Sequence, residues 1–177
     1  MPPVRSPALP EAEPGPAERA ERLARELDAA FAARARLYWH LLVTLREALG
    51  EAEAERLLSR AIERHGAAAG AVIFAGLETP APMAVASRFL TLASPDWGRL
   101  FPHVVEEDGG TVTVRVTRCP LKDAWVADGR TEAEVETLCR VAGHADHGVF
   151  GAAECGFSAE TWRQGRGGCC VLRFTDT

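Results

Sequence analysis

The first candidate for chemistry is a cysteine at the end of an expected β-strand. Residues 111–117 alternate polar and apolar side chains, the pattern of a half-buried strand. Pro120 ends this strand, because proline has no N–H group to donate to a neighbouring strand. Cys119 therefore lies at a strand end beside Arg118, and a thiol with a cationic neighbour can have a lowered pKa and act as a nucleophile. The alternative interpretation is that Cys119 is a small buried apolar residue.

Two more candidates follow Cys119 in a segment that we expect to form a short helix. Asp123 lies four residues after Cys119, so one helical turn would bring the carboxylate and the thiol together. Trp125 lies in the same segment. We predict that both side chains contact a substrate held next to the thiol.

A second group of titratable residues lies about twenty positions further along the chain. Thr131 and Glu134 match a capping box that would start a helix. Cys139 lies on the apolar side of this helix, and positions four and seven residues later return to the same face, which brings Asp146 near that thiol. An imidazole that is oriented by a carboxylate can act as a general base. The candidates in this group are Cys139, His144, Asp146 and His147.

The same side chains are also potential metal ligands. The residues that carry suitable thiol, imidazole and carboxylate groups are Cys119, Cys139, His144, Asp146 and His147. The chain has no Cys-x-x-Cys pair and no His-x-x-x-His pair, so its spacing does not match a structural zinc site. We therefore expect no resident cofactor, while a metal bound by these five residues remains an open alternative.

His40 and two adjacent cysteines near the C-terminus are further candidates. His40 follows Tyr38 and Trp39 in an apolar stretch, where a histidine is usually a hydrogen-bonded core residue. The alternative is that His40 lines a pocket. Cys169 and Cys170 open a segment with strand character, and neighbouring residues of a strand point to opposite faces. We therefore expect one of these thiols in the core and the other facing a pocket.

The N-terminal half of the chain is expected to be helical. Apolar residues recur at helical spacing between Leu23 and Leu49, which predicts one long helix with a single buried stripe. A second helix follows and is expected to end at Gly66. Residues 1–16 are rich in proline and poor in large apolar side chains, which predicts a disordered tail. Residues 17–177 are expected to form a single α+β domain.

Strands are expected only in the C-terminal half. The segments on either side of Gly109-Gly110 predict a β-hairpin at about 102–118. A final short strand at about 169–174 should pair with this hairpin. The predicted fold class is therefore α+β: a helical N-terminal half packed with a small antiparallel sheet, with further helices in the C-terminal half.

Composition argues against several classes of partner. The formal net charge is -5 and no run of basic residues interrupts the chain, so we expect no nucleic-acid partner. No apolar run reaches the roughly 18–20 residues that span a membrane. The 5 cysteines form no paired framework, which favours a reducing compartment and a cytoplasmic protein. The expected partner is a small-molecule substrate, and the N-terminal helices could also support a homodimer.

Three sequence features together resemble one known family. They are Arg118-Cys119-Pro120-Leu121, then Leu138-Cys139 followed by Asp146, and Gly165 before Cys169-Cys170-Val171-Leu172-Arg173-Phe174. In these features the chain resembles the L-2-amino-thiazoline-4-carboxylic acid hydrolase family over most of residues 35–174. The chain departs from the family pattern in two places. An acidic residue is expected closer to Cys139 than Asp146 is, and of the two final cysteines Cys170 better fits the distance to Phe174.

The resemblance implies a hydrolase that opens a C–N bond in a cyclic amidine such as a thiazoline. The carbon between nitrogen and sulfur is electrophilic once the nitrogen is protonated, and its hydrolysis needs a nucleophile or an activated water and an acid. In our hypothesis Cys119 attacks this carbon and Arg118 holds the substrate carboxylate. His147 or His144 transfers protons, oriented by Asp146. The remaining substrate-binding candidates are His40, Cys139, Asp123, Trp125 and Cys170.

Two other hypotheses use the same cysteines, histidines and carboxylate. In one, a metal ion bound by them activates a water molecule. In the other, the protein is a non-enzymatic small-molecule or metal-binding sensor module whose cysteines respond to a thiol-reactive compound. Product that accumulates beyond one equivalent would separate an enzyme from such a sensor.

Overall fold

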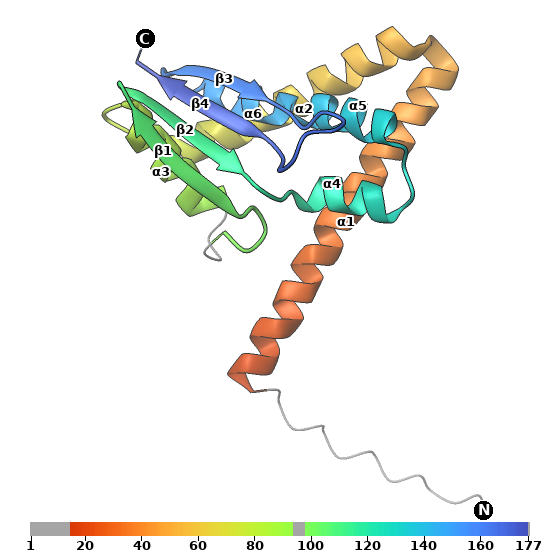
Figure 1. The fold of residues 1–177 in the computed structure, drawn as a ribbon, viewed down its shortest axis with the longest axis horizontal. Helices are drawn as coiled ribbons and strands as arrows, with labels where there is room; N and C mark the ends of the chain where they lie inside the picture. The colour runs from red at the N-terminus through yellow and green to blue at the C-terminus, as the bar shows by residue number, and fades with distance from the viewer. Residues whose placement is uncertain (1–14, 94–97, 177) are drawn as a thin grey trace, which may run out of the picture.

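Helices dominate the first half of the chain in the computed structural model, which describes residues 15–93 and 98–176. The helices of this half are α1 (Pro16–Leu49), α2 (Glu51–Ile73) and α3 (Pro82–Ala93), with α1 and α2 joined at Gly50 (Figure 1). Three shorter helices follow in the second half, α4 (Pro120–Ala127), α5 (Glu132–Ala142) and α6 (His144–Gly151). The predicted tail, residues 1–16, lies outside the described residues except for Gly15 and Pro16.

The strands form one antiparallel sheet with the order β1-β2-β4-β3. Their bounds are β1 (His103–Asp108), β2 (Thr111–Val116), β3 (Gly156–Glu160) and β4 (Val171–Thr175). β1 and β2 form the predicted hairpin, and β4 pairs with β2 so that Leu172 lies opposite Val114. The α+β class is confirmed. β3 was not predicted, because its five residues show no clear alternation, and it pairs with β4 at the edge of the sheet.

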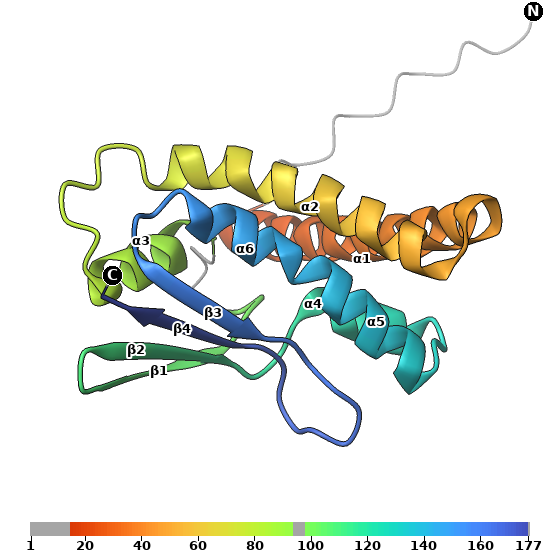
Figure 2. The same cartoon turned by 90° about the horizontal axis from the view of Figure 1, so that it is seen from above.

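The helices cover one face of the sheet (Figure 2). The buried side chains that β2 and β4 contribute to an apolar cluster with α3 and α6 are Val112, Val114, Leu172 and Phe174. Phe150 of α6 packs edge-on against Phe174, with 4.8 Å between the ring centroids. A second cluster joins α1, α2, α4 and α5 around Trp125, whose indole N–H donates a hydrogen bond of 2.7 Å to the carbonyl oxygen of Ala35.

Helices α2 and α6 pack with their backbones in direct contact. A Cβ atom added at Gly66 would overlap the carbonyl oxygen of Ala145, and one added at Gly148 would overlap the carbonyl oxygen of Glu63. Gly70, one helical turn after Gly66, is equally constrained. The prediction that the second helix ends at Gly66 is therefore wrong. The helix continues to Ile73, and the glycines serve the helix–helix contact instead of breaking the helix.

The predicted buried stripe of α1 is also wrong. The fully buried residues of this helix are Ala35 and Leu42, whereas Leu23, Leu37 and other leucines of the predicted stripe are exposed. The helix is longer than the part of the molecule that it packs against, and its N-terminal end projects from the body (Figure 1). The periodicity of apolar residues identifies the apolar side of the helix, but it does not show whether another element covers that side.

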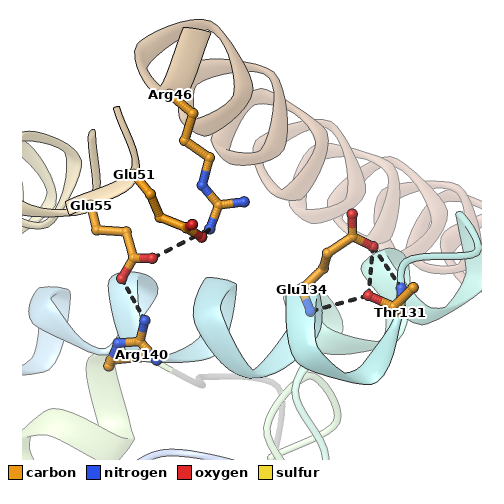
Figure 3. A network of polar contacts seen from close by, with 6 residues as sticks. All are labelled: Arg46, Glu51, Glu55, Thr131, Glu134 and Arg140. Carbon is orange, nitrogen blue, oxygen red and sulfur yellow. Dashed lines mark hydrogen bonds and ion pairs between the residues drawn. The ribbon is translucent and has the colours of Figure 1, made fainter. Parts of the chain in front are cut away.

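An ion-pair network connects the end of the α1–α2 hairpin to α5 (Figure 3). Arg46 of α1 pairs with Glu55 of α2 at 3.3 Å, and Glu55 also accepts a hydrogen bond from Arg140 of α5. At the start of α5, Thr131 and Glu134 form the predicted capping box, which is confirmed. These contacts hold α5, and therefore Cys139, against the helical hairpin.

The contact between α2 and α6 predicts an unusual response to alanine. Alanine normally stabilises a helix relative to glycine, but Gly70→Ala should lower the free energy of unfolding by about 3 kcal/mol because the added methyl group meets the backbone of α6. Gly151→Ala is the matched control, since its Cβ would enter open space. Urea denaturation should show no loss for the control. Equal stability of the two variants would contradict the close helix contact.

Candidate active site

A cavity of about 330 Å³ lies between α1, α2, the C-terminal helices and the inner face of the sheet. Most of its wall is apolar, including Phe31 and Leu121. The side chains with polar or reactive groups that line it are Arg34, Tyr38, His65, His103, Cys119, Cys139, Asp146, Cys169 and Cys170. A mostly apolar hollow with a few converging polar groups is the usual form of a small-molecule site.

Four thiols from three parts of the chain meet at this cavity. Cys119 caps the N-terminus of α4 directly after β2, and Cys139 lies on the buried side of α5. Backbone hydrogen bonds between Val116 and both Cys169 and Cys170 extend the β2–β4 pairing past its last ladder residues. This pairing brings the C-terminal cysteines to Cys119. The prediction that only one of the two adjacent cysteines faces a pocket is wrong, because both line it and their sulfur atoms are 3.6 Å apart.

Three of these thiols, those of Cys119, Cys139 and Cys169, are held in their neutral form. A hydrogen bond with Cys169 and burial raise the pKa of Cys119 well above its usual value. Burial likewise raises the pKa of Cys139. For Cys169, the hydrogen bond with Cys119 lowers the pKa, but the hydrogen bond with Cys170 and burial outweigh it and raise the pKa to about 12. A nucleophilic role for any of these thiols therefore requires a base.

Arg118 does not lower the pKa of Cys119, contrary to the sequence prediction. Its Nε atom donates a hydrogen bond of 2.6 Å to the carboxylate of Asp123, and both side chains are exposed and do not line the cavity. The expected Cys119–Asp123 pair is replaced by this ion pair. Trp125 does line the cavity. Its indole N–H group already donates a hydrogen bond to the carbonyl oxygen of Ala35, so only the apolar part of the ring is available to a ligand.

Asp146 is the carboxyl group of the cavity. It lies in the first turn of α6, where the glycine contacts bring the backbones of α6 and α2 close together. Burial raises the pKa of Asp146 to about 7. The group can therefore accept or donate a proton near neutral pH, which is the property required of a general acid or base.

The histidines predicted to work with Asp146 lie elsewhere. His144 does not line the cavity, and its Nδ1 atom lies 3.5 Å from a carboxylate oxygen of Glu63. His147 is exposed on the far side of α6, where its ring packs edge-on against Phe157. His40 is exposed on α1 and does not line the cavity. The structure thus brings Asp146 to the thiols without these imidazoles.

Sequence reasoning missed four of the polar lining residues. They are Arg34, Tyr38, His65 and His103. Arg34 and Tyr38 are four residues apart on α1, a spacing that could have indicated one shared face. His65 is exposed and His103 is half-buried, so both lie at the border between surface and cavity. The Nδ1 atom of His103 donates to the carbonyl oxygen of Phe101 at 2.8 Å, which leaves its other ring nitrogen as the potential acceptor.

Across residues 15–93 and 98–176, no group of three or more His, Cys, Asp or Glu side chains is arranged to hold a metal ion. Of the five candidate ligands, Cys119, Cys139 and Asp146 line the cavity and the two histidines do not. In the same ranges no helix is long and apolar enough to cross a membrane.

Comparison with known proteins returns one family. A family model described as L-2-amino-thiazoline-4-carboxylic acid hydrolase matches residues 30–174. This range contains every residue that lines the cavity. No curated protein and no solved structure matches the chain.

Burial of Asp146 predicts a specific dependence of stability on pH. The folded-state pKa of about 7 lies above the ordinary value of 3.8, so the folded protein binds the proton more tightly than the unfolded chain. This carboxyl group therefore destabilises the fold progressively as the pH rises from about 4 to about 7. Relative to the wild type, Asp146→Asn should gain up to about 4 kcal/mol in free energy of unfolding between pH 4 and pH 8.

Urea denaturation of both proteins at the two pH values would measure this difference. Asp123→Asn is the control, because Asp123 is an exposed carboxylate. A difference between Asp146→Asn and wild type that does not change with pH would contradict the assigned pKa shift.

Proposed function

The chain belongs to the L-2-amino-thiazoline-4-carboxylic acid hydrolase family, and on that basis we propose that its cavity hydrolyses a small cyclic amidine, a thiazoline or a related heterocycle. The observation that carries this proposal is the composition of the cavity. Within the matched range, one hollow collects the thiols of Cys119 and Cys139 together with a carboxyl group whose pKa is about 7. A nucleophile and a proton-transfer group are the two parts that hydrolysis of an amidine requires.

Arg34 replaces Arg118 as the proposed partner of the substrate carboxylate. It lines the cavity, where its guanidinium group lies 5.1 Å from the centre of the Phe31 ring. Arginine keeps its charge at all relevant pH values and binds carboxylates through two parallel hydrogen bonds. Arg118 is instead paired with Asp123 outside the cavity. The substrate would then be oriented with its carboxylate at α1 and its ring toward the thiols.

The proposed reaction uses Cys119 as nucleophile and Asp146 as the group that moves protons. The bound amidine is protonated, so the carbon between its nitrogen and sulfur is electrophilic. The carboxylate of Asp146 accepts the S–H proton of Cys119 while the sulfur bonds to this carbon. Asp146 then gives that proton to the ring nitrogen, and the C–N bond breaks with its electron pair on nitrogen.

Water completes the cycle. It adds to the carbon of the covalent adduct, and Asp146 takes a proton from it. Asp146 passes this proton to the sulfur of Cys119, which leaves as a neutral thiol. Since the pKa values of the thiols are raised, the thiol form is the resting state and the base is needed at each turnover. In this proposal the reaction needs no cofactor.

Turnover of L-2-amino-thiazoline-4-carboxylate, followed by mass spectrometry, tests the proposal. The wild type should form a product that is heavier by one water. Cys119→Ser should lower kcat/KM by at least about 100-fold, because the hydroxyl group is a much poorer nucleophile with this base. Cys155→Ser is the matched control, since Cys155 lies outside the cavity and donates to the carbonyl oxygen of Thr175 at 3.2 Å. Its turnover should equal that of the wild type.

Each other outcome of this assay has a distinct meaning. Turnover that survives in Cys119→Ser would contradict the covalent step and favour attack by water with Asp146 as base. Saturable binding without turnover would favour the sensor module. Activity that a chelator removes, together with stoichiometric metal in the purified protein, would contradict the cofactor-free reaction. The product also reports the bond that breaks, because C–N cleavage releases an amine, whereas C–S cleavage releases a thiol that a thiol reagent detects.

A further inference from the structure

Between Leu23 and Leu41, α1 carries an apolar surface that no described element covers. Leu23, Leu27, Leu37 and Leu41 are between 40% and 59% exposed. They belong to a series with steps of four and three residues, the spacing of a coiled-coil seam. The series, called here the leucine seam, is Leu23, Leu27, Ala30, Arg34, Leu37 and Leu41. It spans about 27 Å of helix at the usual rise per residue.

The exposed end of α1 needs a partner to be stable as a helix. This end projects beyond the body of the molecule (Figure 1). An unsupported helical segment of about 12–15 residues is marginal in water unless its apolar side packs against another surface. Away from the seam the same turns carry charged side chains that pair within the helix, such as Arg22 with Glu26 at 3.6 Å. The segment is therefore amphipathic, with its apolar side unused.

Read in reverse, the leucine seam again has two leucines at each end, and only Ala30 and Arg34 at its centre change places. In an antiparallel pair of α1 helices, Leu23 lies opposite Leu41 of the second copy and Leu27 lies opposite Leu37. At the centre the small Ala30 lies opposite Arg34, whose guanidinium group lies over the Phe31 ring of its own chain and therefore to one side of the seam. A parallel pair would instead place Arg34 against Arg34, two like charges in an apolar contact.

We propose that the leucine seam binds a second copy of this chain, with the two α1 helices antiparallel and related by a two-fold axis. A two-fold contact uses the same surface on both subunits, and the antiparallel pairing of this seam places leucine against leucine at both of its ends. The two leucine pairs on each side of the centre supply the apolar contact, and the Ala30–Arg34 layers set the direction. This inference does not depend on the hydrolase proposal, and its test needs no substrate.

Sedimentation velocity of the full chain over a range of concentrations measures the assembly. The wild type should be a dimer that dissociates on dilution. Leu27→Glu should be a monomer, because it places a charge opposite Leu37 of the second copy. Val72→Glu is the control, since Val72 is an exposed apolar residue of α2 away from the seam, and it should remain dimeric. Near-UV circular dichroism, which reports the packing of buried aromatic side chains such as Trp125, should be the same for each variant and the wild type, because the substituted side chains are exposed.

A second pair of variants tests the direction. Leu27→Glu combined with Leu37→Lys places opposite charges across an antiparallel seam and should dimerise at least about threefold more tightly than Leu27→Glu alone. Leu27→Glu combined with Leu37→Glu is its matched control and should remain a monomer. Three results would overturn the proposal: a monomeric wild type at all concentrations, a dimer that Leu27→Glu leaves intact, or a Glu/Lys variant that associates no better than the Glu/Glu variant.

Discussion

The backbone contact between α2 and α6 is the constraint on which the candidate site depends. Gly66 and Gly70 on one helix and Gly148 on the other remove the side chains that would otherwise separate the two backbones. The contact fixes the first turn of α6 at the cavity and thereby places Asp146 in the wall of the same cavity as the thiols. It also sets the distance between the helical hairpin and the sheet, because α6 packs against the sheet through Phe150. A bulkier helix contact would open the same space to water.

The cavity formed in this way is low in charge. Hydrogen bonds between thiols and burial raise the pKa values of Cys119 and Cys169, burial raises that of Cys139, and burial holds the pKa of Asp146 near 7, while Arg34 lies at the wall. Such a site suits a small ligand that brings its own positive and negative groups, as an amidine with a carboxylate does. In our account Arg34 takes the negative group and Asp146, when ionised, faces the positive one. In this proposal a single carboxyl group, that of Asp146, makes every proton transfer that a histidine–aspartate pair would otherwise share.

The sequence was informative where local pattern decides structure. Alternation and a glycine turn located the hairpin, and a capping box located the start of α5. It also singled out Cys119 and Asp146, which lie in the same cavity. The sequence was misleading where a contact with a residue far along the chain determines the structure. Gly66 looks like a helix end until α6 is packed against it, and His147 faces away from the cavity because successive residues of a helix point in directions about 100° apart.

The central claim is that a carboxylate-bearing cyclic amidine binds between Arg34 and the thiols. A crystal structure with 2-aminothiazole-4-carboxylate tests this most directly, because the aromatic ring keeps the substrate's shape and resists hydrolysis. We expect the ligand to occupy the cavity with its carboxylate on Arg34 and its 2-amino group toward Asp146. A ligand bound at the surface beside His147, or bound in the cavity with its carboxylate away from Arg34, would show that this binding mode is wrong.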